Sequence, residues 1–286
     1  MTNRDVILEC IRNERCAMRL WSYISATLTA LVSASSAVAH EFWVEPLTYQ
    51  VQPGAEIKAE LFVGQDFSGI SYPFNDRRFD RFGIVIGGKE RPVTGKIGDE
   101  PALKMAVHED GLAVVVYQRA AEEAIYSELT KFQSFLAEKD LSEVIAQHQA
   151  RGFGERRFTE SFVRYAKTLI GVGSGAGADR ATGLHTEIIA EANPYADAIS
   201  QMPVRVLLAG KPRRNAQVML FDKTQDGSVA VTQLRTDDEG RVQFPVEPGH
   251  AYLVDAVAAA ALANNDVEAG PVWITHWASL TFAVPN

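Results

Sequence analysis

The sequence predicts a mainly β protein: two β-sandwich-like domains with a short helical insert between them, after a cleaved signal peptide. Three observations carry this prediction. The chain opens with an uncharged apolar run that ends in small residues. Short apolar segments separated by Gly, Pro and Asp turns fill both halves of the remainder. A helical period appears only between those halves. We therefore expect a signal peptide at 1–39, an N-terminal β domain at 40–176 and a C-terminal sandwich at 177–286.

The first 39 residues resemble a secretory signal. The run from 20 to 36 carries no charge, follows Arg19, and ends at Ala37-Val38-Ala39, which is the small-residue cleavage pattern. The run is short for a membrane span and has no basic stop, so we expect cleavage after Ala39, a periplasmic location and no membrane span afterwards. An uncleaved anchor is the alternative. Met18 would open a normal signal, so it is a second candidate start.

The composition of the mature chain excludes several classes of protein. Both cysteines, Cys10 and Cys16, precede the cut, so neither a disulfide nor a thiolate metal site is expected. The net charge of the whole chain is −8, and removal of four arginines and three carboxylates with the signal makes it more negative. This balance argues against nucleic acid or an anionic membrane as a partner.

The expected elements follow in chain order. Strands are predicted in the N-terminal part at 56–63 and 82–86, and a hairpin at 102–118 with His108 in its turn. Apolar residues at helical spacing predict an insert of two or three short helices from about 127 to 170, the last from Phe158, Phe162, Tyr165 and Leu169. The glycine-rich stretch 171–177 reads as a linker. Turns at roughly ten-residue spacing then predict a small antiparallel sandwich, closed by a strand at 273–284.

His40 is the first residue after the predicted cut. Its free α-amine and its imidazole Nδ1 can bind one metal ion together, an arrangement called a histidine brace. These donors suit Ni, Co, Cu or Zn. The amine must lose its proton to bind, from a reference pKa of about 7.7 to 8.0. Chance placement of a histidine after a cleavage site is the alternative reading.

Two further histidines are candidates to complete such a metal site. His185 begins a predicted strand, and His276 lies in one between Trp273 and Trp277. A lone histidine in a strand is by default a core or rim residue, so this reading stays open beside the ligand reading. Glu41 is a candidate to hydrogen-bond a metal ligand without binding the metal itself. The remaining mature histidines, His108, His148 and His250, are expected at the surface.

No catalytic residue is predicted. The sequence has no readable Ser-His-Asp order, HExxH motif or phosphate-binding loop, so we expect neither an enzyme nor an organic cofactor. Trp43, Trp273 and Trp277 could form a carbohydrate platform, but aromatics in strands are usually core. A brace-type copper oxidase is the less favoured enzymatic alternative.

Six segments in a fixed order carry a resemblance to a known family: 39–46, 160–169, 187–194, 204–212, 236–244 and 277–282. In this combination the chain resembles the domain of unknown function 4198 family. The resemblance implies a secreted two-part β protein whose second part is similar to transthyretin-like and carboxypeptidase-regulatory sandwiches. It also implies, from some members, an accessory role in nickel or cobalt uptake, with the mature N-terminal histidine as proposed ligand. Only His40 matches that role.

The sequence therefore leads to one expected function and one alternative. We expect a periplasmic protein that captures a divalent transition metal, nickel or cobalt first and copper next, and delivers it to a membrane metal transporter. His40, His276 and His185 would be its ligands. The alternative is a non-catalytic β-sandwich module that binds a protein or a glycan and has no metal role.

Overall fold

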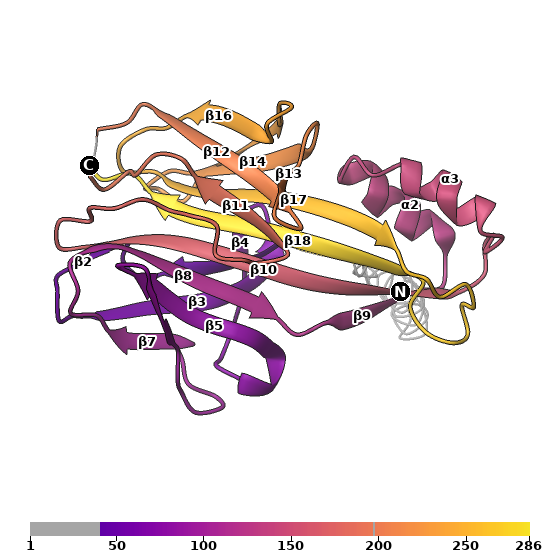
Figure 1. Cartoon of the computed structure of the whole chain (residues 1–286), viewed down its shortest axis with the longest axis horizontal. Helices are drawn as coiled ribbons and strands as arrows, with labels where there is room; N and C mark the ends of the chain where they lie inside the picture. Colours follow the sequence, from indigo (N-terminus) through magenta and orange to yellow (C-terminus); the bar gives the residue numbers. More distant parts are fainter. Residues whose placement is uncertain (1–40, 197) are drawn as a thin grey trace, which may run out of the picture. The chain divides into compact units, whose positions relative to one another are not determined.

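The computed structural model describes residues 41–196 and 198–286, which are built mainly from strands in three sheets (Figure 1). The prediction of a mainly β fold is thereby confirmed. Two helices, α2 (Leu129–Glu138) and α3 (Glu143–Ala150), and a short 3-10 turn, η1 (Asp76–Arg78), complete the described secondary structure.

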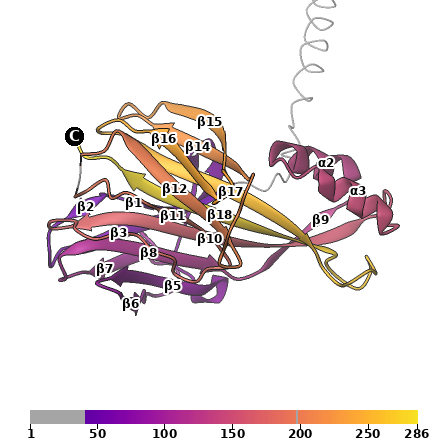
Figure 2. The same cartoon turned by 45° about the horizontal axis from the view of Figure 1, so that its top comes forward.

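A ten-stranded sheet forms the centre of the described residues. Its main path runs β15-β14-β17-β18-β10-β8-β5-β6, with β2 and β9 also paired to β10. The strands of this central sheet are β2 (Gln50–Val51), β5 (Phe79–Ile86), β6 (Lys89–Pro92), β8 (Gly111–Arg119), β9 (Glu122–Tyr126), β10 (Phe158–Val172), β14 (Gln217–Lys223), β15 (Val229–Arg235), β17 (Ala251–Ala261) and β18 (Trp273–Ala283). The long pair β10 and β18 runs parallel along the middle (Figure 2).

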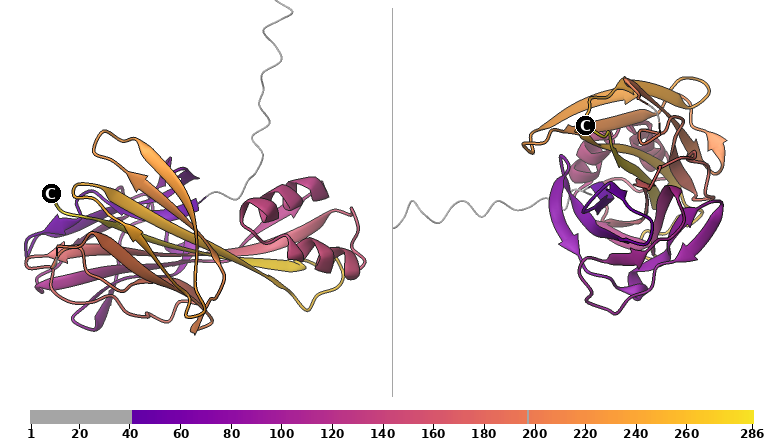
Figure 3. Two further views of the ribbon diagram at one scale, coloured as in Figure 1. Left: turned by 90° about the horizontal axis from the view of Figure 1, so that it is seen from above. Right: turned by 90° about the vertical axis from the view of Figure 1, so that its left-hand side faces the viewer.

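Two smaller sheets cover the central one. The N-terminal sheet contains β1 (Glu41–Pro46), β3 (Glu56–Gln65), β4 (Ser68–Tyr72) and β7 (Leu103–Ala106). The C-terminal sheet contains β11 (Thr186–Ala190), β12 (Gln201–Leu208), β13 (Lys211–Pro212) and β16 (Arg241–Pro245). Figure 3 shows these two sets of strands on either side of the long central strands.

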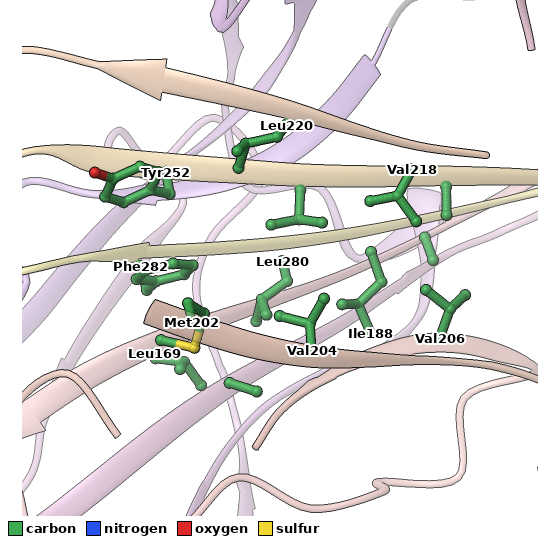
Figure 4. Close-up of a cluster of buried hydrophobic side chains, with 14 of the residues drawn as sticks. Leu169, Ile188, Met202, Val204, Val206, Val218, Leu220, Tyr252, Leu280 and Phe282 are labelled. Atoms are coloured by element: carbon green, nitrogen blue, oxygen red, sulfur yellow. The ribbon is translucent and has the colours of Figure 1, made fainter. Parts of the chain in front are cut away.

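Successive residues of the central strands point to different hydrophobic cores, because side chains in a strand alternate between faces. Leu169 of β10 packs with the C-terminal sheet, whereas Ile170 packs with the N-terminal sheet. The C-terminal core contains Val204 and Val206 of β12 against Val254 and Leu280 of the central sheet (Figure 4). Each end of the chain thus forms a sandwich, and both sandwiches use the same central sheet.

The helices pack on the tryptophans of β18. Phe135 of α2 stacks on Trp277 with ring centroids 5.5 Å apart, and both residues belong to one aromatic core with Trp273 and Phe132. The apolar spacing in the sequence predicted this buried face correctly, since Leu129, Phe132, Phe135 and Leu136 are all buried. The first part of the predicted helical insert is confirmed.

The third predicted helix is wrong. Phe158–Val172 is β10, a fifteen-residue strand that pairs with β2, β8, β9 and β18. The strand is covered on both faces, so apolar residues occur at nearly every position and include the four whose spacing imitates a helix. Its content of Phe, Tyr, Thr, Val and Ile favours a strand, and long-range pairing decides the outcome.

The hairpin predicted around His108 is also wrong. β7 pairs with β3 in the N-terminal sheet, whereas β8 pairs with β5 and β10 in the central sheet. The turn at residues 107–110 therefore connects two layers. β8 is buried at nearly every position because it lies inside the central sheet, and the sequence pattern carries no signal for which sheet each segment joins.

The predicted boundary between residues 176 and 177 lies in the loop between β10 and β11, and strands from both sides of it belong to the central sheet. In the described part of the chain, no helix has the length and apolar content needed to cross a membrane. The predicted signal peptide and His40 lie outside the described residues.

Candidate functional site

His185 and His276 come together from different elements. His276 lies in the middle of β18, where it is paired with Val163 of β10 and Ala258 of β17. His185 directly precedes β11, and its carbonyl oxygen accepts a hydrogen bond from the Ala209 backbone N–H at 2.6 Å. This bond continues the pairing of β11 with β12 by one residue, so His185 is fixed at the end of the C-terminal sheet, and its ring packs against that of His276.

The two imidazoles form a close pair. Their ring centroids are 4.2 Å apart, with 41° between the ring planes. Tyr165 of β10 adds a third polar group, because its hydroxyl oxygen lies 3.4 Å from Nδ1 of His276. We call His185, His276 and Tyr165 the histidine pair site. His185 is exposed and His276 is half-buried, so the site is open to solvent on one side.

The environment favours the neutral form of His276. Burial, and secondly the neighbouring His185 ring, lower the pKa of His276 to about 4. A neutral imidazole has a nitrogen lone pair available to a metal ion, whereas an imidazolium has none. His276 is therefore ready to act as a ligand throughout the neutral pH range.

The histidine pair site supplies only part of a metal's coordination sphere. In the ranges 41–196 and 198–286, no three His, Cys, Asp or Glu side chains form a group that could hold a metal ion. Two imidazoles leave further positions to water or to donors that the structure does not describe. His40, the predicted brace residue, is not among the described residues.

Glu41, the first described residue, lies on a different side of β18 from the histidine pair site. Its carboxylate accepts a hydrogen bond from Lys139 Nζ at 2.8 Å, and this ammonium lies 5.2 Å from the centroid of the Trp277 ring. Trp277 follows His276 in the strand, so the two side chains point to opposite faces. Glu41 is buried beside Lys139 and is remote from the imidazole pair.

The carboxylate of Asp255 adds to the charges around Lys139. Asp255 is 1% exposed, and burial raises its pKa to about 7, against the opposing effect of the Lys139 charge. Sequence reasoning missed this cluster, because its members come from β1, the end of α2 and β17. The cluster joins the helices to the two sheets beneath them.

Of the three histidines expected at the surface, His108 is confirmed there and His148 is not. His108 is exposed, as expected, and His250 is partly buried and pairs with Asp222 at 2.7 Å. His148, expected at the surface, is completely buried. Its Nδ1 accepts a hydrogen bond from Trp273 Nε1 at 3.1 Å, and its Nε2 lies 3.1 Å from the Gly154 carbonyl oxygen. Flanking glutamines suggested exposure, but His148 occupies the buried face of α3 with Val144.

The three tryptophans considered as a carbohydrate platform are core residues. Trp43, Trp273 and Trp277 are at most 2% exposed, and all three pack among other aromatic rings. The expectation that strand aromatics are core is confirmed. No flat aromatic surface for a sugar can be built from these three residues.

Fold and site together define a class: a mainly β protein with a solvent-open pair of imidazoles, one on the central sheet and one at the end of the C-terminal sheet. The chain belongs to the family described as Domain of unknown function (DUF4198), whose model matches residues 37–260. The family named from the sequence segments is thus confirmed.

Comparisons with individual proteins add little. No curated protein matches this chain. Among solved structures, the D0-D1 domain of intimin is 12% identical, with 85% of this chain and 97% of that chain covered at a TM-score of 0.21. A tetra-tandem repeat from the extending region of a large adhesion protein is 10% identical, covering 85% of this chain and 49% of that one at a TM-score of 0.20. Scores this low carry no conclusion about activity.

Proposed function

We propose that this protein is exported, binds a divalent transition metal ion in the periplasm and passes it to a membrane metal transporter. Nickel or cobalt is the first choice of ion and copper the second. The observation that supports the proposal is the approach of His185 and His276 to a ring separation of 4.2 Å. These two residues are 91 positions apart in the sequence, so the fold itself has to create the pair.

The chemistry of the pair fits these ions. Imidazole nitrogen is a preferred donor for Ni, Co and Cu, and the proposed site contains no thiolate that would favour softer ions. The low pKa of His276 removes proton competition at that ring near neutral pH. An open site on the surface also suits a protein that must release its ion again, since a closed four-ligand site would retain it.

His40 remains part of the proposal as a donor of its α-amine and imidazole after cleavage. Since Glu41 contacts Lys139 on the Trp277 side of β18, the contribution of His40 has to be tested separately from that of the histidine pair site. The proposal contains no catalytic step, and the non-catalytic protein- or glycan-binding module remains its competitor.

Calorimetry with the mature chain tests the proposal. The protein starting at His40, with its amino terminus verified by mass spectrometry, is titrated with Ni²⁺, Co²⁺ and Cu²⁺ near pH 7.5. We expect the double variant His185→Ala/His276→Ala to bind at least about tenfold more weakly, because two donors are lost. His40→Ala should weaken binding independently. His108→Ala, which changes an exposed histidine outside the site, should leave the affinity unchanged.

Two results would contradict the proposal. One is the absence of binding to all three ions by the verified mature chain. The other is binding that is the same in the double variant, in His40→Ala and in His108→Ala, since the ion would then sit elsewhere. Capture of a glycan or protein that persists in chelator and in all three variants would favour the competing module.

A further inference from the structure

A second group of titratable side chains lies completely inside the protein and plays no part in the proposed metal site. Lys167 of β10 points into the C-terminal core, where it meets Asp179 of the β10–β11 loop and Glu187 of β11. The side chains of Lys167 and Asp179 are 0% exposed and that of Glu187 is 2% exposed. One buried ammonium thus faces two buried carboxyl groups.

The distances place the amine directly against one carboxyl group. Nζ of Lys167 lies 2.7 Å from Oδ1 and 2.8 Å from Oδ2 of Asp179, so the nitrogen faces the carbon between these oxygens. Oε2 of Glu187 lies 3.7 Å from the same nitrogen. A nucleophile, an electrophilic carbon and a proton acceptor are therefore close together in a site without solvent.

We propose that Lys167 and Asp179 become joined by an intramolecular amide, an isopeptide bond, and that Glu187 carries the proton that this reaction must move. The inference is independent of the metal-binding proposal, because none of these residues belongs to the histidine pair site.

The reaction is a condensation and needs no oxidant or other reagent. A proton first moves from the ammonium to the Asp179 carboxylate, giving a neutral amine and a neutral acid. Nζ then attacks Cγ, and the new N–C bond forms. Glu187 accepts a proton from Nζ and returns it to the departing hydroxyl, the C–O bond breaks, and one water leaves. The product is a secondary amide.

Burial favours the neutral carboxylic acid that takes part in this reaction. Removing a charge from water is costly, so a buried carboxyl group holds its proton more readily than an exposed one. Burial is also the main influence that raises the pKa of Asp179, against the opposing effect of Lys167. Fixed contact between the two groups replaces a slow encounter, as in other oriented intramolecular reactions.

Backbone donors are in place around both carboxyl groups. The Ala190 N–H donates to Oδ2 of Asp179 at 2.9 Å, and the Arg180 N–H donates to Oδ1 at 2.8 Å. These donors would stabilise the negative oxygen of the tetrahedral intermediate. Glu187 is itself held by the Thr182 N–H at 2.8 Å and the Gly183 N–H at 3.1 Å. These hydrogen bonds hold the Glu187 carboxyl group in place beside the Lys167 amine.

The cross-link would suit this chain, whose two cysteines both lie before residue 40, within the predicted signal peptide. An amide between β10 and the following loop would fasten the glycine-rich residues 173–177 of that loop to the central sheet without a disulfide.

Mass spectrometry of the purified mature protein tests the inference. We expect the denatured chain to be lighter than its sequence by one water. Trypsin should then yield a single peptide from Tyr165 to Arg180, uncleaved after Lys167 and lighter by that water, because an acylated lysine is not a trypsin site. Release of the unmodified peptides Tyr165–Lys167 and Thr168–Arg180 in full yield would overturn the proposal.

Variants separate the cross-link from other losses of water, such as succinimide formation at an aspartate. Lys167→Arg keeps the charge but should restore the full mass. Glu187→Gln should leave most of the chain uncondensed. Lys104→Arg, at an exposed lysine, should retain the lighter mass. A mass deficit that persists in Lys167→Arg would overturn the assignment, and the wild-type peptide map decides alone if a variant does not fold.

Discussion

At the scale of single residues, the histidine pair site depends on one half-buried imidazole. His276 lies on the central sheet beneath the exposed His185. Its pKa of about 4 lies below the reference value of about 6.5 that we take for the unfolded chain. Between these two values the unfolded chain binds a proton that the folded chain does not. His276 therefore stabilises the fold above about pH 6.5 and loses this contribution as the pH falls towards 4.

Replacing His276 by glutamine should remove this pH dependence. The full shift corresponds to about 3 kcal/mol. Because His276 is partly exposed, we expect the metal-free wild type to lose only about 1 to 2 kcal/mol relative to His276→Gln between pH 6.5 and 4. Urea unfolding of both proteins across this range measures the difference. A difference that stays constant with pH would contradict the prediction. Burial also raises the pKa of Glu160 and of Asp255 to about 7, but both groups are present in both proteins, so their effects cancel in the comparison.

At the scale of elements, the helical hairpin α2–α3 depends on the face that it presents to β18. Phe135 is 3% exposed and stacks on Trp277. We expect Phe135→Ala to lower the free energy of unfolding by about 3 to 5 kcal/mol, since it leaves a cavity in an aromatic core. Urea unfolding followed by tryptophan fluorescence gives the value.

The matched control in the same helix is Lys131→Ala. The side chain of Lys131 is 54% exposed and forms an ion pair with the exposed Glu128 across one turn, so its removal should change the stability by less than about 0.5 kcal/mol. Equal losses for Phe135→Ala and Lys131→Ala would mean that α2 contributes little to the stability of the fold.

β10 is the segment whose secondary structure the sequence pattern predicts wrongly. The spacing of Phe158, Phe162, Tyr165 and Leu169 fits a helix, and the structure has a strand. A strand covered on both faces loses the alternation that would identify it. Only the partners β8 and β18, distant in sequence, distinguish the two conformations. The same wrong prediction hid the environment of Lys167. The burial of this side chain follows only from the strand conformation of β10 and from its place between two sheets.

At the scale of the whole molecule, the shared central sheet predicts how the protein unfolds. β18 pairs with β10 over Glu160–Thr168, and the C-terminal core includes Val114, Tyr165 and Leu169, which all precede residue 177. A fragment of residues 177–286 would expose these contact surfaces. We expect the mature chain to unfold in one cooperative transition and the fragment to show none.

Circular dichroism during thermal unfolding, together with size-exclusion chromatography, checks this prediction. A fragment that is monomeric and unfolds cooperatively would contradict it. Two separate transitions in the mature chain would do the same, since the two sandwiches would then be independent in spite of their common sheet.

The sequence by itself determined what depends on local pattern: the mainly β class, the helices over 129–150, the family, and the short list that contained His185 and His276. Composition, periodicity and turn residues act over a few neighbours and can be read along the chain. Only the tertiary structure decided that Phe158–Val172 is a strand, that His148 is buried, that His185 and His276 meet, and that Lys167 faces Asp179 and Glu187. Each of these depends on contacts between segments that are distant in the sequence, and the free energy of such contacts belongs to the assembled fold rather than to any segment alone.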